Sequence, residues 1–222
     1  TVEGMDARVS GFRVGDEVVV STGLGGALAE RAVVSALHVA RKPSNLSFEE
    51  AAAIPAAGQT ALQALRDQAG LGAGQRLLVN GAGGGVGTFA VQIGKILGAH
   101  VTAVTSAAHR DLVLGLGADE VIDYAVSDFA ANGELYDVIV DCVGNAPFER
   151  AAASVRPGGA LLLVVSDRKG LFGAARQSRA SGKVVSAASV PYTPESMAAL
   201  SRLAGSGVIR PVIDRTYPLA DI

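Results

Sequence analysis

The chain has 222 residues, of which 49% are hydrophobic and 18% are charged. This length and composition exclude a disordered tail and a small disulfide-stapled domain, because the chain can bury a large apolar core. The formal net charge of -2 and the 5% of aromatic residues give no general attraction for nucleic acid or for an anionic membrane surface, and few platforms on which bases could stack.

Cys142 is the only cysteine, so the chain has no internal disulfide and no zinc site built from several thiolates. No apolar run approaches the roughly 20 residues that span a bilayer. These features predict a cytoplasmic protein with neither a membrane nor a nucleic-acid partner. The chain starts at Thr1 without a secretory pattern, which indicates a cropped or processed sequence.

Residues 1–55 have the pattern of a β-rich domain. Two short strands are predicted at Glu17 to Val20 and at Arg31 to Ser35, joined by the glycines between Gly23 and Gly26 without a helical crossover. Ser47 and Glu50 form a capping box that opens a helix through Ala53, and Pro55 ends that helix. A second helix is predicted near 60–69.

From about residue 76 onward, apolar runs of strand length alternate with helical patterns. Runs without polar alternation are expected for strands that are covered on both faces, and alternation with amphipathic helices predicts an α/β fold with a doubly wound parallel sheet. The predicted strands are Leu77–Val79, Val101–Val104, Val121–Ile122, Val138–Val140, Leu161–Val165 and Val184–Val185, and the helices begin near Val86, Arg110, Phe148 and Pro194.

The strongest motif is the glycine-rich stretch from Asn80 to Gly87, which joins a predicted strand to an amphipathic helix. Glycines let a backbone turn tightly and approach a pyrophosphate, whose charge the amides and the dipole at the helix N-terminus then stabilise. The best register of the dinucleotide fingerprint is Ala82-x-Gly84-x-x-Gly87. It predicts a cofactor site at Gly84, Gly85, Val86 and Gly87.

The end of the second strand indicates which dinucleotide is bound. A site for NAD places an acidic residue there for the ribose hydroxyls, whereas this chain has Thr105 and Ser106, followed by His109 and Arg110. These residues repel no phosphate, so the sequence favours NADP (NADPH). Arg110 is equally consistent with a solvated helix residue, and Tyr124 either donates a further hydrogen bond or caps the sheet.

Five stretches, in order, resemble the medium-chain dehydrogenase/reductase superfamily over essentially the whole chain, and in particular its zinc-independent quinone oxidoreductase (zeta-crystallin-like) group. They are Phe12–Val18, Leu46–Pro55, Gly58–Leu62, the glycine loop with Gln92–Lys95, and Leu116–Tyr124.

The resemblance implies a domain organisation and an activity. Residues 1–55 would be the C-terminal part of a GroES-like catalytic domain, 56–210 a Rossmann NADP-binding domain, and 211–222 a segment that returns toward the catalytic domain. The chain would be truncated at both ends. Ala56 replaces a cysteine of zinc-dependent relatives, which favours hydride transfer from NADPH to a quinone or an activated alkene or carbonyl without metal.

The resemblance also assigns roles to individual residues. Thr60 would contact the nicotinamide end, the glycine loop would contact the pyrophosphate, and Ser106 and Tyr124 would contact the adenosine phosphate, where His109 replaces a lysine of the family. The walls of the cofactor site would be Cys142, Val143, Gly144, Val165 and Ser166, with Cys142 favoured as a small wall residue over a nucleophile.

The basic stretch Asp167 to Lys183 is the least family-like, and a solvated loop is favoured there over a basic lid. The apolar strand around Val184 and Val185 predicts a homodimer through a continuous sheet.

The same residues bear on several rival functions. A methyltransferase would need acidic residues where Asn80 and Ser106 stand, and a short-chain dehydrogenase would need a Tyr-x-x-x-Lys motif that no tyrosine here provides. An alcohol dehydrogenase or enoyl reductase of the same superfamily shares every motif. A non-catalytic NADPH-binding protein also stays open, because a fold alone does not fix an activity.

Overall fold

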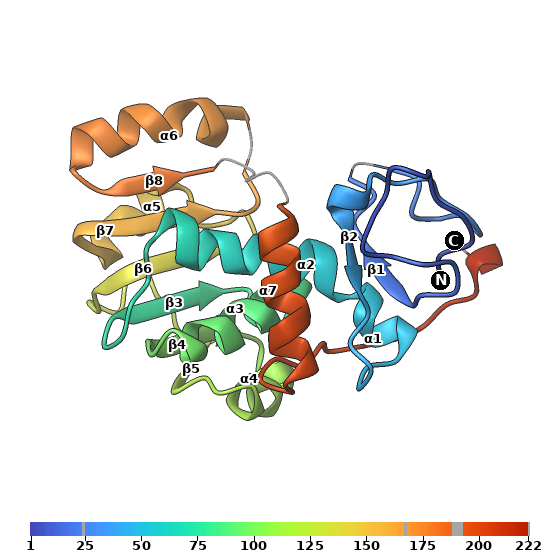
Figure 1. Ribbon diagram of the computed structural model, residues 1–222. Coiled ribbons are helices and arrows are strands. Elements are labelled where there is room, and N and C mark those ends of the chain that lie inside the picture. Colours follow the sequence, from blue (N-terminus) through green and yellow to red (C-terminus); the bar gives the residue numbers. More distant parts are fainter. Residues whose placement is uncertain (24, 167, 188–192, 222) are drawn as a thin grey trace. The chain divides into compact units, whose positions relative to one another are not determined.

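The structure, a computed structural model, describes residues 1–23, 25–166, 168–187 and 193–221 (Figure 1). Contacts divide the chain into two compact units, one comprising Thr1–Gln59 with Pro191–Ile222 and the other Thr60–Val190. The first division falls within a helix, α2 (Ile54–Leu62). The predicted Rossmann limits, 56–210, differ from those of the second unit, because the described residues from 193 onward group with the N-terminal unit.

The second unit is built on a sheet of six parallel strands in the order β5-β4-β3-β6-β7-β8. The chain runs outward from β3 to β5, returns to β6 beside β3, and runs outward again to β8 on the other side. Ligands bind open α/β sheets where the strand order reverses in this way. The strands are β3 (Arg76–Asn80), β4 (His100–Thr105), β5 (Glu120–Asp123), β6 (Tyr136–Asp141), β7 (Val155–Leu163) and β8 (Val184–Ser186).

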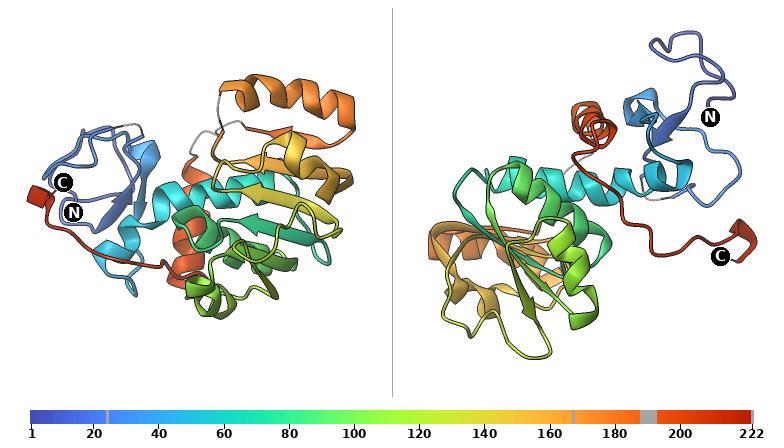
Figure 2. Two further views of the ribbon diagram at one scale, coloured as in Figure 1. Left: turned by 180° about the vertical axis from the view of Figure 1, so that it is seen from behind. Right: turned by 90° about the horizontal axis from the view of Figure 1, so that it is seen from below.

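Helices cover both faces of this sheet. In the view from below, α3 and α4 lie on one face and α5 and α6 on the other (Figure 2), as right-handed crossovers in opposite directions require. Burial follows from the sequence, since Leu77, Leu78 and Val79 of β3 are fully buried. The helices are α3 (Gly85–Ile96), α4 (Arg110–Gly115), α5 (Phe148–Ala151) and α6 (Arg168–Ser181), with 3₁₀ turns at Ala107–His109 and Ala152–Ser154.

The predicted doubly wound fold is confirmed, and each predicted strand of the sheet overlaps an observed one, although β7 begins at Val155 rather than at the predicted Leu161. The prediction of a solvated loop in the basic stretch after β7 is wrong, because residues 168–181 form the helix α6. Its sequence is free of proline and rich in residues with good helix propensity. Ser178 fixes it to the sheet, since the amide of Val185 in β8 donates to Oγ of Ser178 over 2.9 Å. Asp167 lies outside the described residues.

The N-terminal unit contains a two-stranded antiparallel sheet, β1 (Val18–Val20) and β2 (Val39–Arg41), and the helix α7 (Pro194–Gly205). Ser201 of α7 donates to the carbonyl of Arg41 over 2.8 Å. A second strand had been expected at Arg31 to Ser35, and this prediction is wrong. Val33 is fully exposed, and Ser35 caps a 3₁₀ turn, Ala36–His38, so the partner strand begins only at Val39.

The helices around residue 50 follow the predicted signals with one shift. The capping box is confirmed, since Oγ of Ser47 accepts from the amide of Glu50 and the carboxylate of Glu50 accepts from the amide of Ser47. Helix α1 (Phe48–Ala52) then ends, but α2 starts at Ile54 with Pro55 as its second residue, where a missing amide costs no hydrogen bond. A π-helical segment continues α2 over Gln63–Gln68.

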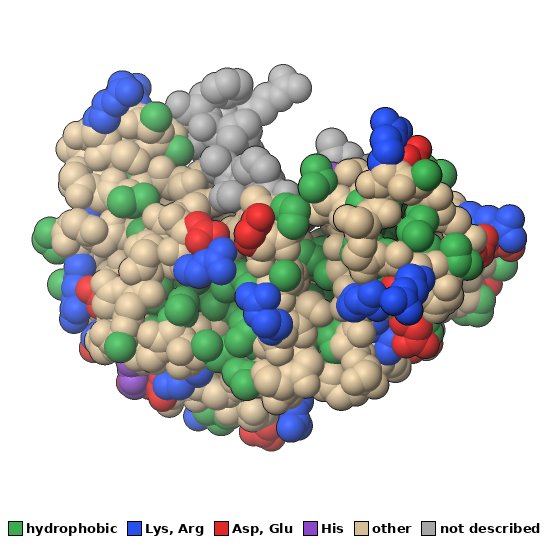
Figure 3. Space-filling view, viewed as in Figure 1, with side chains coloured by type: hydrophobic (Ala, Val, Ile, Leu, Met, Phe, Trp, Pro, Cys, Tyr) green, Lys and Arg blue, Asp and Glu red, His purple; other side chains and the backbone are tan. Residues whose placement is uncertain are grey.

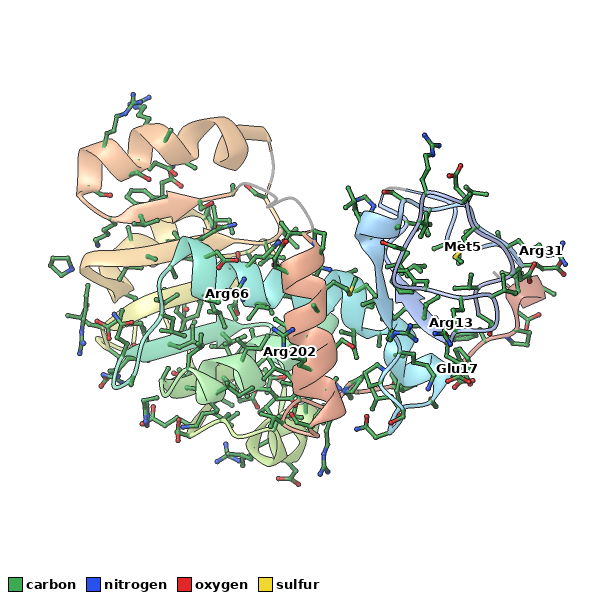
Figure 4. The ribbon with its side chains drawn as sticks, in the orientation of Figure 1. Met5, Arg13, Glu17, Arg31, Arg66 and Arg202 are labelled. Atoms are coloured by element: carbon green, nitrogen blue, oxygen red, sulfur yellow. The ribbon has the colours of Figure 1, made fainter. Side chains whose placement is uncertain are left out.

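Charged side chains of both signs are interspersed on the face shown in Figure 3, as the small net charge suggests. In the N-terminal unit, where Figure 4 labels Arg13 and Glu17, a hollow of about 430 Å³ is lined by Gly11, Phe12, Arg13, Asp16 and Arg41. Arg41 forms an ion pair there with Asp16, with 3.0 Å between Nη2 and Oδ2. Among the described residues, no helix is long and apolar enough to cross a membrane.

Candidate functional site

The glycine loop lies between β3 and α3, at the carboxyl edge of the sheet. Gly81 has a φ of +82°, and a Cβ placed there would lie 2.6 Å from Cγ2 of Val143. The turn after β3 therefore requires glycine at Gly81, one residue before Ala82, which the predicted register takes as its first position. Ala82 itself is fully buried, and no described residue other than glycine has a positive φ.

Two further glycines allow close approach within the loop. A Cβ on Gly87 would lie 2.1 Å from the carbonyl oxygen of Gly81, so α3 packs against the turn at a distance that only glycine permits. A Cβ on Gly83 would lie 2.9 Å from Oγ1 of Thr105. The backbone of the loop is thus held close to the end of β4.

The first turn of α3 suits an anion. Gly84 is the N-cap and has no side chain to accept from the helix amides, and the first turn contains no acidic residue. The first amides of a helix lack intrahelical acceptors and stand at the positive end of its dipole. The glycine cradle and these amides fit a pyrophosphate.

The residues predicted to bind the adenosine end of the cofactor form one cluster beside the glycine loop. Oγ of Ser106 and Nδ1 of His109 are 3.1 Å apart, and the ring of His109 lies against Gly83, where a Cβ would be 3.1 Å from its Cγ. Tyr124 joins through its backbone, whose amide donates to the carbonyl of Thr105 over 3.2 Å, while its side chain is exposed. Arg110 is exposed as the first residue of α4.

The opposite wall comes from the loops that follow β6 and β7. Val143 lies against Gly81, and Gly144, with a φ of +86°, allows Val165 to approach, since a Cβ would be 2.9 Å from its Cγ1. Val143, Gly144, Val165 and Ser166 are all exposed. The structure therefore brings these predicted wall residues to the same edge as the glycine loop.

Cys142 is held in this wall by its backbone, whose amide donates to the carbonyl of Asn80 over 3.0 Å. Burial and the neighbouring carboxylate of Asp141 raise the pKa of its thiol to about 12. The thiol is therefore protonated at neutral pH, and nucleophilic chemistry needs the thiolate. This agrees with Cys142 as a wall residue.

A polar network at the base of the site was missed by the sequence interpretation. The carboxylate of Asp141, at the end of β6, is fully buried. It accepts from the side-chain amide of Asn80, and that amide also donates to Oδ1 of Asn145 over 2.7 Å. The available signal was a polar residue at the end of each of two apolar strands, Asn80 on β3 and Asp141 on β6.

Thr60 lies in α2 at the point where the two compact units divide, and it is half-buried. Arg66, labelled in Figure 4, belongs to the π-helical segment that follows and pairs with Asp67 at 2.6 Å. Within the described ranges, no three His, Cys, Asp or Glu side chains come together in a way that could hold a metal ion.

Comparisons with known proteins identify the family. A family model described as "Zinc-binding dehydrogenase" matches residues 116–222. The chain is 35% identical over 96% of its length to the "Chloroplast envelope quinone oxidoreductase homolog" of Arabidopsis thaliana, and it spans 68% of that protein. It is 34% identical over 99% of its length to a mitochondrial NAD(P)H oxidoreductase of Mus musculus, of which it spans 62%.

Among solved structures, the quinone oxidoreductase of Pseudomonas syringae pv. tomato matches with a TM-score of 0.79 and 27% identity, covering 99% of this chain and 72% of that one. The fold, the glycine loop and these relatives agree with the predicted resemblance. The chain belongs to the medium-chain dehydrogenase/reductase superfamily of oxidoreductases, and its relatives there include quinone oxidoreductases.

Proposed function

We propose that the chain binds NADPH at the carboxyl edge of its sheet and belongs to an enzyme that transfers a hydride to a quinone or to an activated alkene or carbonyl without zinc. The observation that carries the dinucleotide site is the convergence of three loops, after β3, β6 and β7, at the point where the strand order reverses. Two relatives are named as a quinone oxidoreductase homolog and an NAD(P)H oxidoreductase, which supports the nicotinamide cofactor and the reductase class.

The preference for NADPH rests on the cluster beside the glycine loop. Ser106 stands where a carboxylate would bind the ribose of NADH, and His109 lies within hydrogen-bonding distance of it. Neither side chain repels a phosphate, and both can donate hydrogen bonds to one. Arg110, exposed on the first turn of α4, adds a positive charge close by in the sequence.

Each part of the site has a distinct task in this proposal. A bound nicotinamide supplies the hydride. The amides of Gly85, Val86 and Gly87 hold the pyrophosphate, and the apolar walls at Val143 and Val165 exclude water beside it. Thr60 orients the nicotinamide end by a hydrogen bond. Orientation is the main contribution to rate when the protein does no covalent chemistry.

The substrate and the absence of zinc are supported by sequence more than by geometry. The family resemblance implies that Ala56 replaces a zinc-ligand cysteine of zinc-dependent relatives, and the chain contains a single cysteine. Metal analysis of the purified protein and activity in the presence of a chelator test this. Solved structures similar to this chain include an NAD-dependent alcohol dehydrogenase, so alcohols belong in the substrate panel.

The proposed assembly is a homodimer that joins two sheets through β8. This strand is at the edge of the sheet, and Val184 on it is 45% exposed. Ala188 and Val190, which the predicted strand included, lie outside the described residues. Sedimentation should give a dimer at micromolar concentration. Val184→Glu should yield monomers, because it places like charges opposite each other across the dimer interface. A monomeric parent chain would contradict the proposal.

Domain roles and cellular location also stay proposals. Residues 1–55 are proposed as part of a catalytic domain, 56–210 as the NADP-binding domain and 211–222 as a return segment. A cytoplasmic location was predicted, while the relatives named above are chloroplast and mitochondrial proteins.

The test is a titration of this chain with NADPH and, separately, with NADH, followed by cofactor fluorescence. Tighter binding of NADPH is expected. Turnover is then measured with quinones, enones, alcohols and enoyl thioesters. Equal or preferred binding of NADH would contradict the NADPH assignment, and binding without turnover of any acceptor by the full-length protein would favour a non-catalytic NADPH-binding protein.

A further inference from the structure

Asp141 is a buried carboxylate with an unusual set of partners. It is fully buried at the end of β6, and its hydrogen-bond donors in the described part of the chain are N–H groups rather than a cation. Oδ1 accepts from the amides of Val143 at 3.0 Å and Gly144 at 3.2 Å, and Oδ2 accepts from the amide of Ala146 at 2.9 Å. The side-chain amide of Asn80 donates to Oδ1 over 2.8 Å.

Such a carboxylate is costly to bury, and several converging donors are needed to offset the loss of water. Because three of these donors are successive or nearly successive backbone amides, the carboxylate fixes the path of the loop after β6. The loop carries Val143 and Gly144, which pack against Gly81 and Val165 respectively. The position of the wall therefore depends on Asp141.

The same carboxylate is tied to the glycine loop. Asn80 is the residue directly before Gly81, and its side-chain amide is shared between Asp141 and Asn145. Asn80 is itself buried, with 4% of its surface exposed. One group thus connects the two loops that form opposite walls of the candidate site.

We propose that Asp141 is a positioning residue for the dinucleotide, which sets the distance between the glycine loop and the loop after β6 without touching the cofactor itself. This inference rests on the dinucleotide site proposed above. The alternative is a purely structural role, in which Asp141 stabilises the fold. Its replacement would then weaken cofactor binding only by destabilising the whole domain.

The chain offers a matched control on the same strand. Asp137 also joins β6 to β3, since its Oδ2 accepts from the amide of Arg76 over 2.7 Å, and it pairs with Arg156 at 3.0 Å. It lies toward the opposite end of β6, away from the glycine loop. Replacing either carboxylate by its amide preserves shape and removes one charge and one acceptor oxygen.

The experiment compares Asp141→Asn and Asp137→Asn in the full chain by NADPH titration and by urea unfolding. Both variants should lose stability, because Asp141→Asn leaves at least one backbone amide without its acceptor and Asp137→Asn removes the charge that pairs with Arg156. We expect Asp141→Asn to weaken NADPH binding about tenfold or more, and Asp137→Asn to change it less than about threefold. Asn80→Ala, which leaves three of the four donors of Asp141 in place, should give an intermediate loss and serves if Asp141→Asn does not fold.

Two results overturn the inference. If Asp141→Asn, or in its place Asn80→Ala, binds NADPH like the parent chain, or if Asp137→Asn weakens binding by the same factor at the same loss of stability, Asp141 has no positioning role. If the parent chain binds neither NADPH nor NADH, the proposed function fails first and this inference with it.

Discussion

Asp141 and Asp137 occupy opposite ends of one strand, and the two ends of the sheet differ in how they use a carboxylate. At the carboxyl edge, Asp141 is fully buried and accepts from amides of the chain, while at the amino edge Asp137 pairs with the half-exposed Arg156. The first arrangement fixes the course of a loop, and the second closes a sheet end with an ion pair. Asp141 therefore holds a loop of the proposed cofactor site, whereas Asp137, which also accepts from the amide of Arg76, holds neighbouring strands together away from that site.

The glycines of the loop after β3 allow close approach at the carboxyl edge. At the carboxyl edge, a Cβ on Gly81, Gly83 or Gly87 would lie within 3.0 Å of another loop or of the backbone. Gly74, in the turn before β3 at the amino edge, has open space around it and needs glycine only for its φ of +78°. Close approach is not confined to the carboxyl edge, because a Cβ on Gly98, before β4, would lie 2.9 Å from Cβ of Ala73.

The largest effect is expected from Gly87→Ala. The added methyl would overlap the carbonyl of Gly81, so α3 must shift, at a cost of about 3 kcal/mol or more in the free energy of unfolding. NADPH binding should be lost with it. Urea denaturation and cofactor titration measure the two effects.

Its control is Gly115→Ala, at the end of α4, where an added Cβ meets nothing within 4 Å. This variant should be stable to within about 1 kcal/mol, in the stabilising direction, because alanine has the higher helix propensity. Similar losses in the two variants would show that the close approach at Gly87 has no special role.

The next effect concerns selectivity at the cluster beside the loop. Ser106→Glu should weaken NADPH binding about tenfold or more by repulsion between the carboxylate and the phosphate, and should leave NADH binding equal or better. Ala131→Glu, which adds the same charge at an exposed site, is the matched control. If Ser106→Glu weakens the binding of NADPH and NADH equally, the cluster beside the loop does not contact the phosphate of NADPH.

A third effect appears at alkaline pH. The folded thiol of Cys142 has a pKa of about 12 against an ordinary value of 9.0, owing to burial and the charge of Asp141. Between these values the unfolded chain releases a proton that the folded chain keeps, so the free energy of unfolding falls as pH rises, by roughly 1 kcal/mol per pH unit. Unfolding of Cys142→Ser and the parent chain from pH 8 to 11 should diverge accordingly; parallel curves would contradict the buried, protonated thiol.

The smallest effect is expected at the amino edge. Arg156→Gln removes the ion pair with Asp137 and should cost less than about 1 kcal/mol, because the guanidinium is half-exposed. NADPH affinity should be unchanged. A loss of affinity here would contradict the division between the two edges.

Much of the fold and of the glycine loop could be predicted from the sequence, because the relevant signals are local. Uninterrupted apolar runs such as Leu77–Val79 predict covered strands, and the glycines after Asn80 predict the turn into α3. The network around Asp141 could not be predicted, since its partners come from β3 and from the loop after β6, and a residue pattern does not tell which polar ends of strands face one another.

The errors have local causes as well. The strand expected at Arg31 to Ser35 has two valines, but Ser35 starts a turn and the exposed Val33 finds no partner, so the strand forms later. The stretch expected to be a basic loop is the helix α6, because its Arg, Lys, Ala and Gln residues have good helix propensity and no proline interrupts them.

The most direct test of the central claim is hydrogen exchange of the chain with and without NADPH. The account predicts slower exchange on adding NADPH at the carboxyl edge, in residues 81–88, 104–110 and 142–146, and no change at the amino edge, in residues 72–76, 98–100 and 132–137. Protection at the amino edge, or unchanged exchange in the glycine loop while NADPH is bound, would contradict it.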